Sequence, residues 1–274
     1  MILFVFEGAK CEPRLFNSLQ ALFFRKEAES FICTYNSNIY SLYTKLKRLD
    51  IFGDPIGASG DTVTVLNEIL KQQGDNTLDA IVETNVSEIY LFFDYDFHNS
   101  RLSLDENNLH LQEMIDYFHE ETANGKLYIN YPMVESIRYT QRLFDINYWQ
   151  YIVMRDECHK FKHLACKFSY YSSFDHLLIS NNKNEADEKK IEKAKQARCN
   201  WCNLIVMNVM KANYICYGSN SFPFEKMLIS QKDILENQIQ KYVCQEKSKV
   251  AILNAFPLFL YEYFKNAAIH CCRE

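Results

Sequence analysis

The stretch IYLFFDYD, residues 89–96, decides the fold, because a continuous apolar run ends there in two carboxylates. The run is rich in aromatic and β-branched side chains, which is typical of a strand that is buried on both faces. Carboxylates at the end of a buried strand are costly unless they are paired or bind a cation. Since side chains two residues apart on a strand point the same way, Asp94 and Asp96 can face one point.

A similar apolar run, residues 2–6, opens the chain and passes directly into Glu7 and Gly8. Further strands are expected at residues 31–35 and 127–130, and helical patterns separate all four runs. This alternation predicts a parallel α/β sheet flanked by helices. Ligands bind outside the carboxyl ends of the strands in such sheets, so neighbouring strands would bring Glu7 to Asp94 and Asp96.

The pattern changes after Pro132, and no further clear strand follows. We therefore predict an α/β domain over residues 1–135 and an α-helical domain over residues 136–274. The polar stretch 180–195 is interpreted as the exposed start of a helix, because acids and bases alternate in it. Helices are expected over residues 136–155, 158–170, 186–214, 224–241 and 249–268.

Composition limits the class of protein. Among the 274 residues 48% are hydrophobic and 24% charged, which is typical of a globular chain. The net charge of −5 argues against a protein that coats nucleic acid, but it allows a local basic groove. The apolar run 250–264 is too short to span a bilayer, and no basic segment precedes the apolar N-terminus, so we expect a cytoplasmic protein without membrane contact.

The three carboxylates Glu7, Asp94 and Asp96 predict a metal site. Hard oxygen ligands of this kind suit Mg²⁺ or Mn²⁺. Such ions commonly take their remaining ligands from water and from substrate phosphates. The chemistry that follows is phosphoryl transfer or phosphodiester hydrolysis. The alternative interpretation is that Glu7 caps a helix and that the aspartates are solvated turn residues.

At this point the sequence resembles a known family. A strand ending in Glu7-Gly8, followed by a later strand ending in Asp94-Tyr95-Asp96, resembles the Toprim domain of topoisomerases, bacterial primases and overcoming-lysogenization-defect (OLD) nucleases. The resemblance covers residues 1 to about 135. Within that family, residues 7–13, 34–40 and 131–136 are similar to the RloB- and AriB-like phage-defence nucleases.

The resemblance implies a Mg-dependent endonuclease that cleaves DNA or RNA as the toxic effector of an anti-phage defence system. Glu7 would be the general base or a metal-linked acid, Asp94 and Asp96 would hold the metal, and Glu135 would be a fourth acid. OLD-type members often add a lysine near the scissile phosphate, for which Lys10 and Lys126 are the candidates.

Control by a partner ATPase is expected by analogy with the family, because an unrestrained nuclease would harm its host. The chain has no P-loop motif, so a nucleotide that controls it would bind another subunit. The alternative from another class is a non-catalytic Toprim-like sensor or interaction subunit. A third candidate is a different phosphotransfer enzyme that uses the same metal geometry.

Basic side chains cluster in residues 155–167. At helical spacing Arg155, His159 and Lys162 share one side, where they would bind nucleic acid together with Lys10. The equally weighted alternative is a solvated helix face.

The ten cysteines have irregular spacing, so we interpret them as reduced thiols. Cys199 and Cys202 form a Cys-x-x-Cys motif that would need a second pair to bind zinc, and we predict that they are core residues. The aromatic segment 256–264 is expected to form core or to contact a second copy in a homo-oligomer.

Overall fold

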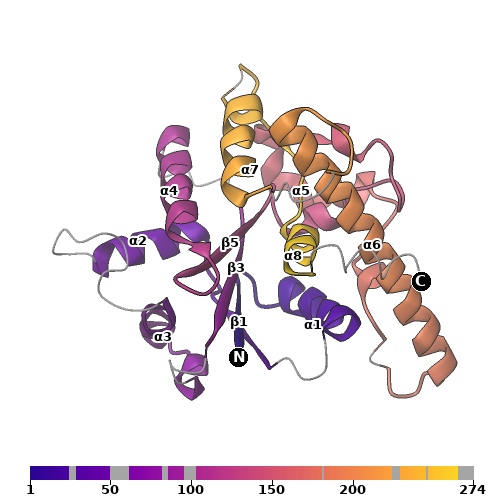
Figure 1. Cartoon of the computed structure of the whole chain (residues 1–274), viewed down its shortest axis with the longest axis horizontal. Coiled ribbons are helices and arrows are strands. Elements are labelled where there is room, and N and C mark those ends of the chain that lie inside the picture. Colours follow the sequence, from indigo (N-terminus) through magenta and orange to yellow (C-terminus); the bar gives the residue numbers. More distant parts are fainter. Residues whose placement is uncertain are drawn as a thin grey trace. The chain divides into compact units, whose positions relative to one another are not determined.

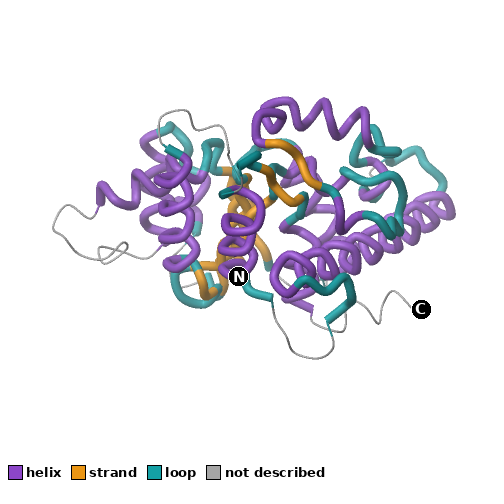
Figure 2. The backbone as a smooth tube through the Cα atoms, turned by 90° about the horizontal axis from the view of Figure 1, so that it is seen from above, coloured by secondary structure: helices purple, strands orange, loops and turns teal. Residues whose placement is uncertain are grey.

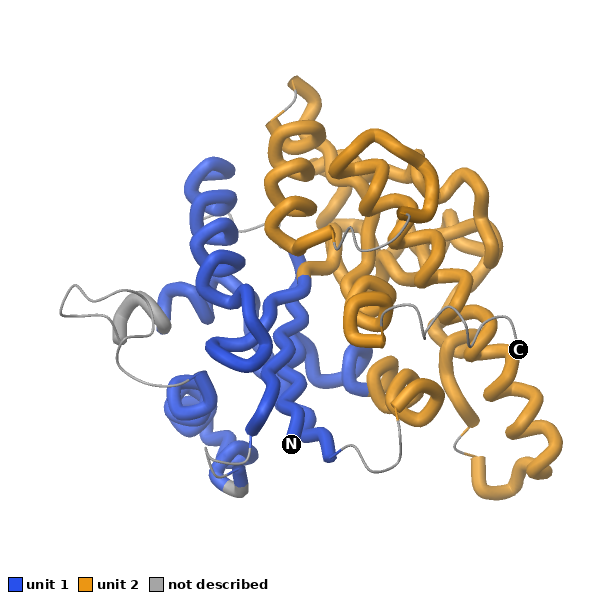
Figure 3. Tube along the Cα trace, in the orientation of Figure 1, with its two compact units in different colours: residues 1–13, 27–128 blue, residues 14–26, 129–274 orange. Residues whose placement is uncertain are grey.

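The computed structural model describes residues 1–24, 29–49, 62–81, 86–95, 103–180, 182–223, 229–244 and 246–264. The chain forms two compact units, which Figure 3 distinguishes by colour. The first consists of Met1–Pro13 and Glu27–Tyr128, and the second of Arg14–Lys26 and Ile129–Glu274. The expected division after residue 135 thus differs from this partition, in which residues 14–26 group with the C-terminal part.

A mostly parallel five-stranded sheet confirms the predicted α/β class. The strand order is β2-β1-β3-β5-β4, and β1 pairs in parallel with both β2 and β3. The short β4 is antiparallel to β5 and was not expected from the sequence. The strands are β1 (Ile2–Phe6), β2 (Ser30–Thr34), β3 (Glu88–Asp94), β4 (His119–Glu120) and β5 (Gly125–Asn130).

The two apolar runs become the centre of this sheet. All of β1 and the residues between the ends of β3 are buried. Their aromatic rings contact one another across the strands, with Phe6 against Phe92 at 5.4 Å between centroids. Tyr128 of β5 stacks on Phe92 at 5.4 Å, and a side chain at Gly125 would meet Ile89. β5 therefore runs in the same direction as β3.

Three helices of the first unit lie along one face of the sheet in Figures 1 and 2. They are α2 (Ile39–Leu49), α3 (Thr62–Gln72) and α4 (Leu104–Tyr117). Ser103 caps α4 and forms a capping box with Glu106, which satisfies backbone N–H groups that the helix itself leaves open.

The second unit is mainly helical. Its long helix α6 is exposed in its first turns, as the polar stretch 180–195 predicted, and most of its residues from Ala197 to Cys216 are buried. Most of α8 is buried, and Phe259 stacks on Phe24, so the aromatic C-terminal segment contributes to the core as predicted. The helices are α1 (Cys11–Phe23, its first turn in the first unit), α5 (Phe161–Phe168), α6 (Asp187–Tyr217), α7 (Gln231–Gln238) and α8 (Ala255–Phe264).

Two sequence predictions for this unit are wrong. A small antiparallel sheet exists where no strand was expected, formed by β6 (Ile152–Met154) and β7 (Lys249–Ala251). Residues 136–155 do not form a helix but short turns. The carboxylate of Asp145 accepts bonds there from Thr140 Oγ1, Tyr151 Oη and two backbone N–H groups, and such bonds compete with a helix.

Short helical turns complete the described chain. The 3-10 turns are Thr77–Ala80, Val134–Arg138, Tyr148–Gln150, Arg155–Lys160 and Asp175–Leu177, and Ile239–Val243 is a π-helical turn. Parts of two expected helices, residues 224–228 and 265–268, lie outside the described residues. No helix in the described ranges is long and apolar enough to cross a membrane.

Candidate metal and phosphodiester site

The ends of β1 and β3 lie side by side, as the sequence predicted. The backbone N–H of Glu7 donates to Phe92 O at 3.1 Å, which continues the parallel ladder by one residue. The Glu7 carboxylate then accepts a hydrogen bond at its Oε2 from the backbone N–H of Asp94 at 2.9 Å. Both acids are only partly buried. Two of the three predicted metal ligands therefore occur together at the carboxyl edge of the sheet.

The segment that carries Asp94 is anchored by Tyr95. Its side chain is 2% exposed, and its hydroxyl donates to Asn108 Oδ1 in α4 at 2.8 Å. Asp96 lies outside the described residues. Within the described ranges, no three His, Cys, Asp or Glu side chains gather closely enough to hold a metal ion. Of the three predicted metal ligands, the structure therefore describes Glu7 and Asp94.

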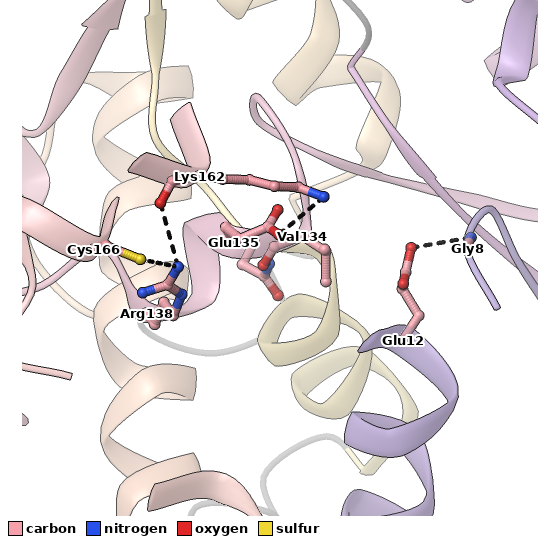
Figure 4. A network of polar contacts seen from close by, with 8 residues as sticks. Gly8, Glu12, Val134, Glu135, Arg138, Lys162 and Cys166 are labelled. Carbon is pink, nitrogen blue, oxygen red and sulfur yellow. Dashed lines mark hydrogen bonds and ion pairs between the residues drawn. The ribbon is translucent and has the colours of Figure 1, made fainter. Parts of the chain in front are cut away.

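A further acid, Glu12, lies beside this strand end and was not singled out from the sequence. It belongs to the first turn of α1 and is 5% exposed. Its Oε1 accepts a hydrogen bond from the backbone N–H of Gly8 at 3.2 Å, as Figure 4 shows. A Cβ atom at Gly8 would lie 2.9 Å from Glu12 Oε2. The glycine after the strand thus provides the space that the buried carboxylate occupies.

The fourth predicted acid, Glu135, is buried in the second unit. It lies in the turn Val134–Arg138 with 4% of its surface exposed. Its Oε1 is 3.4 Å from the ammonium nitrogen of Lys162 in α5, a pair that Figure 4 displays. Its Oε2 is buried and has no hydrogen-bond partner among the described residues. A buried carboxylate oxygen of this kind is costly to leave unsatisfied.

Arg138 fixes the surroundings of this pair. Its guanidinium donates to Lys162 O at 3.4 Å and to Cys166 Sγ at 3.1 Å, both in α5 (Figure 4). It also donates to the backbone oxygens of Tyr171 and Ser172. Arg138 thereby joins the turn that carries Glu135 to the helix that carries Lys162. The sequence did not identify it, because a buried arginine with backbone acceptors follows no motif.

The predicted nucleic-acid-binding side chains lie on the surface. Arg155 and His159 are exposed in the 3-10 turn before α5, and Lys162 is 72% exposed in α5. Lys10 is exposed in the turn between β1 and α1. These exposed positions allow contact with phosphates.

The structure places Lys126, a candidate for the lysine near the scissile phosphate, away from the predicted metal site. It is the second residue of β5, close to the end where Gly125 approaches Ile89 of β3, and its ammonium pairs with Glu121 at 3.7 Å. Since β5 runs parallel to β3, this is the opposite edge of the sheet from Asp94. Lys126 therefore does not belong to the predicted metal site, whereas Lys162 contacts the predicted acid Glu135.

The structure also differs from two predictions for the cysteines, the burial of Cys199 and the reduced state of Cys202. Cys202 is buried as predicted, but Cys199 is exposed. Cys202 is also disulfide-bonded, so the prediction of reduced thiols is wrong for this residue. Cys158 is fully buried, and burial raises the pKa of its thiol to about 12. A thiol in this environment is a poor metal ligand, because the thiolate is the form that binds.

No protein family, curated protein or solved structure matched the chain when it was compared with each of these.

Proposed function

We propose that the chain is a metal-dependent nuclease of the Toprim type, which hydrolyses phosphodiester bonds in DNA or RNA. The observation that carries this proposal is the hydrogen bond between the Glu7 carboxylate and the Asp94 backbone. It joins two acids from neighbouring parallel strands at the edge where α/β sheets bind their ligands. The order of the Glu7-Gly8 and Asp94-Tyr95-Asp96 motifs supports the same function.

The donors fit a hard divalent cation. Glu7, Asp94 and Asp96 offer carboxylate oxygens, which Mg²⁺ and Mn²⁺ prefer over nitrogen or sulfur. These residues would hold the ion, and Glu12 would add negative charge beside Glu7. When bound, the ion would activate a water molecule and stabilise charge on the phosphate oxygens.

Glu135 and Lys162 contribute acid–base and electrostatic groups in this proposal. Glu135 is assigned as a further acid of the nuclease because the resemblance implies it, and its buried Oε2 has no hydrogen-bond partner among the described residues. The Lys162 ammonium remains largely exposed while it contacts Oε1, so it can also contact a phosphate oxygen. A cation next to a phosphate stabilises the charge that develops in the transition state.

Binding of the polymer is assigned to the basic side chains Arg155, His159, Lys162 and Lys10. Phosphate contacts hold a nucleic acid in place without reading its sequence. None of the carboxylates can recognise a base, so the proposal covers both DNA and RNA. The biological setting, an effector of anti-phage defence under the control of a partner ATPase, rests on the family resemblance.

The test is cleavage of labelled single- and double-stranded DNA and RNA with Mg²⁺, with Mn²⁺ and with a chelator. Wild-type protein is expected to cleave with either metal, and Asp94→Asn and Glu7→Gln are expected to be inactive. Glu88→Gln is the matched control, because Glu88 begins the same strand at its other end and its carboxylate bonds to Tyr90. Mg²⁺ binding by calorimetry accompanies each variant.

Two results would contradict the proposal. Full cleavage by both Asp94→Asn and Glu7→Gln would exclude these acids from catalysis. Absence of both Mg²⁺ binding and cleavage in the wild-type protein would favour the non-catalytic interaction subunit.

A further inference from the structure

The turn that carries Glu135 is held from both sides by one buried amide. Asn254, in the connection between β7 and α8, is fully buried. Its Nδ2 donates to Val134 O at 3.2 Å and to Ser136 Oγ at 2.9 Å, so it contacts both chain neighbours of Glu135. Ser136 Oγ in turn donates to Leu253 O at 3.1 Å. The residues on each side of the acid are thus connected to one short segment, 253–254, Val134 through its backbone oxygen and Ser136 through its side-chain hydroxyl.

Asn254 is itself fixed by further hydrogen bonds. Its backbone N–H donates to Asn208 Oδ1 at 2.9 Å, and that oxygen also accepts a bond from the Tyr148 hydroxyl. Its Oδ1 accepts a bond from Phe256 N at 3.1 Å at the start of α8. Every polar atom of the Asn254 side chain therefore has a partner. Buried polar networks that are fully satisfied are rigid and hold their members in one geometry.

We infer that Asn254 is a positioning residue for Glu135, an inference that rests on the catalytic function proposed for this acid. The amide holds the backbone carbonyl of residue 134 and the side chain of residue 136, and so sets the direction in which the Glu135 carboxylate projects. Groups that act on a reacting atom must be held closely, because a displacement of about 1 Å can reduce a rate about 100-fold. Asn254 acts through Glu135 and does not need to contact the substrate.

The matched pair Asn254→Asp and Gln238→Glu tests this inference. Both residues are fully buried amides in the second unit that bridge backbone groups by hydrogen bonds. Gln238 bonds to the N–H and the carbonyl of Ala251 and not to the turn 134–138. Each substitution replaces an amide by an acid of the same shape, and Asn254→Asp retains the acceptor for Phe256 N. Effects that both variants share are due to a buried acid in general. Effects that only Asn254→Asp shows are due to the lost support of the turn that carries Glu135.

Two measurements are made on the full chain. Hydrogen exchange followed by mass spectrometry is expected to be faster over residues 134–138 in Asn254→Asp than in Gln238→Glu. In single-turnover and steady-state cleavage, Asn254→Asp is expected to lower kcat about tenfold or more with KM unchanged. In a Glu135→Gln background the same substitution is expected to have no further effect on kcat. Ser136→Ala, which removes the second acceptor of Asn254, serves if Asn254→Asp does not fold.

Several outcomes would overturn the inference. Exchange over residues 134–138 that is as slow in Asn254→Asp and Ser136→Ala as in Gln238→Glu would show that the amide does not hold the turn. An equal loss of kcat with and without Glu135 would show that Asn254 does not act through this acid. If the wild-type protein does not cleave, the proposed function fails, and the exchange comparison alone decides whether Asn254 positions the turn.

Discussion

The carboxylate of Glu7 accepts a 2.9 Å hydrogen bond from the backbone N–H of Asp94, 87 residues further along the chain. This bond joins the last residue of β3 to the residue that follows β1, two strands that are parallel neighbours. It leaves the two acids at the same edge of the sheet.

Glu7→Gln is expected to retain the fold and lose metal binding. The amide oxygen of glutamine can still accept the bond from Asp94 N–H, but the site loses a negative charge that a divalent cation requires. Calorimetry is expected to show Mg²⁺ affinity reduced about tenfold or more, with an unchanged melting temperature. Glu88→Gln, at the other end of β3, is expected to bind Mg²⁺ as the wild type does. Unaltered affinity in Glu7→Gln would remove Glu7 from the ligand set.

Gly8→Ala is expected to destabilise the protein through Glu12. The new methyl group would lie 2.9 Å and 3.0 Å from the two carboxylate oxygens of Glu12, so this buried side chain must move. The displaced carboxylate would lose its hydrogen bond from Gly8 N–H, and the loss of a hydrogen bond to a buried charged group costs about 1–3 kcal/mol in the free energy of unfolding. Chemical denaturation of Gly8→Ala, Glu12→Ala and the double variant measures the coupling. The methyl group is expected to cost much less when Glu12 is already truncated, and strictly additive effects would show that the two residues do not interact.

Tyr95→Phe is expected to reduce both stability and cleavage. The change removes the bond to Asn108 Oδ1, and leaving a buried acceptor unsatisfied costs about 1–3 kcal/mol. Because Tyr95 lies between Asp94 and Asp96, a looser anchor is also expected to lower kcat. Tyr90→Phe is the control, since Tyr90 lies in β3, the strand that Tyr95 follows, and donates to Glu88 Oε2 at 2.8 Å. It is expected to affect stability alone, and equal kcat losses in both variants would contradict this role for Tyr95.

His176 is expected to make the protein less stable in mild acid. Burial lowers the pKa of His176 from 6.5 to about 4, and the nearby Arg138 acts in the same direction. Between these two pH values the unfolded chain binds a proton that the folded chain does not, so the free energy of unfolding falls as the pH falls. The slope for one such group is at most about 1.4 kcal/mol per pH unit.

Denaturation of His176→Phe at pH values from 7 to 4 checks this contribution. Phenylalanine keeps a ring against Tyr171, which stacks on His176 at 3.9 Å, but it cannot be protonated. The variant is expected to lose less stability than the wild type over this range. Identical pH profiles would show that His176 is not the titrating group.

Arg155→Gln is expected to weaken nucleic-acid binding and its dependence on salt. Each phosphate contact that is lost reduces the slope of log K against log salt by about 0.7–0.9. Binding is measured by the fluorescence anisotropy of a labelled nucleic acid at several salt concentrations. A chelator is present so that the protein does not cleave it. Lys183→Gln, in the exposed stretch before α6, is the control and is expected to leave the slope unchanged. An unchanged slope in Arg155→Gln would favour the solvated-face interpretation.

The central strands and the neighbourhood of Glu7 and Asp94 could be predicted from the sequence. Burial of a strand on both faces requires a continuous apolar run, so residues 2–6 and 89–93 carry their own signal. Alternation with helices then implies parallel neighbours, and the acids follow directly after these runs. The same reasoning failed for residues 136–155, where the side-chain bonds of Asp145 replace helical hydrogen bonds.

Only the tertiary structure decided which partners the other acids have. Glu12 fits against Gly8, and Glu135 pairs with Lys162 in a turn that Asn254 holds from more than a hundred residues away. β6 and β7 likewise pair although each has three residues. Apolar periodicity reports whether a residue is buried, which is a local property of the chain. The partner of a buried polar group is set by contacts between distant segments, and no local pattern in the sequence contains that information.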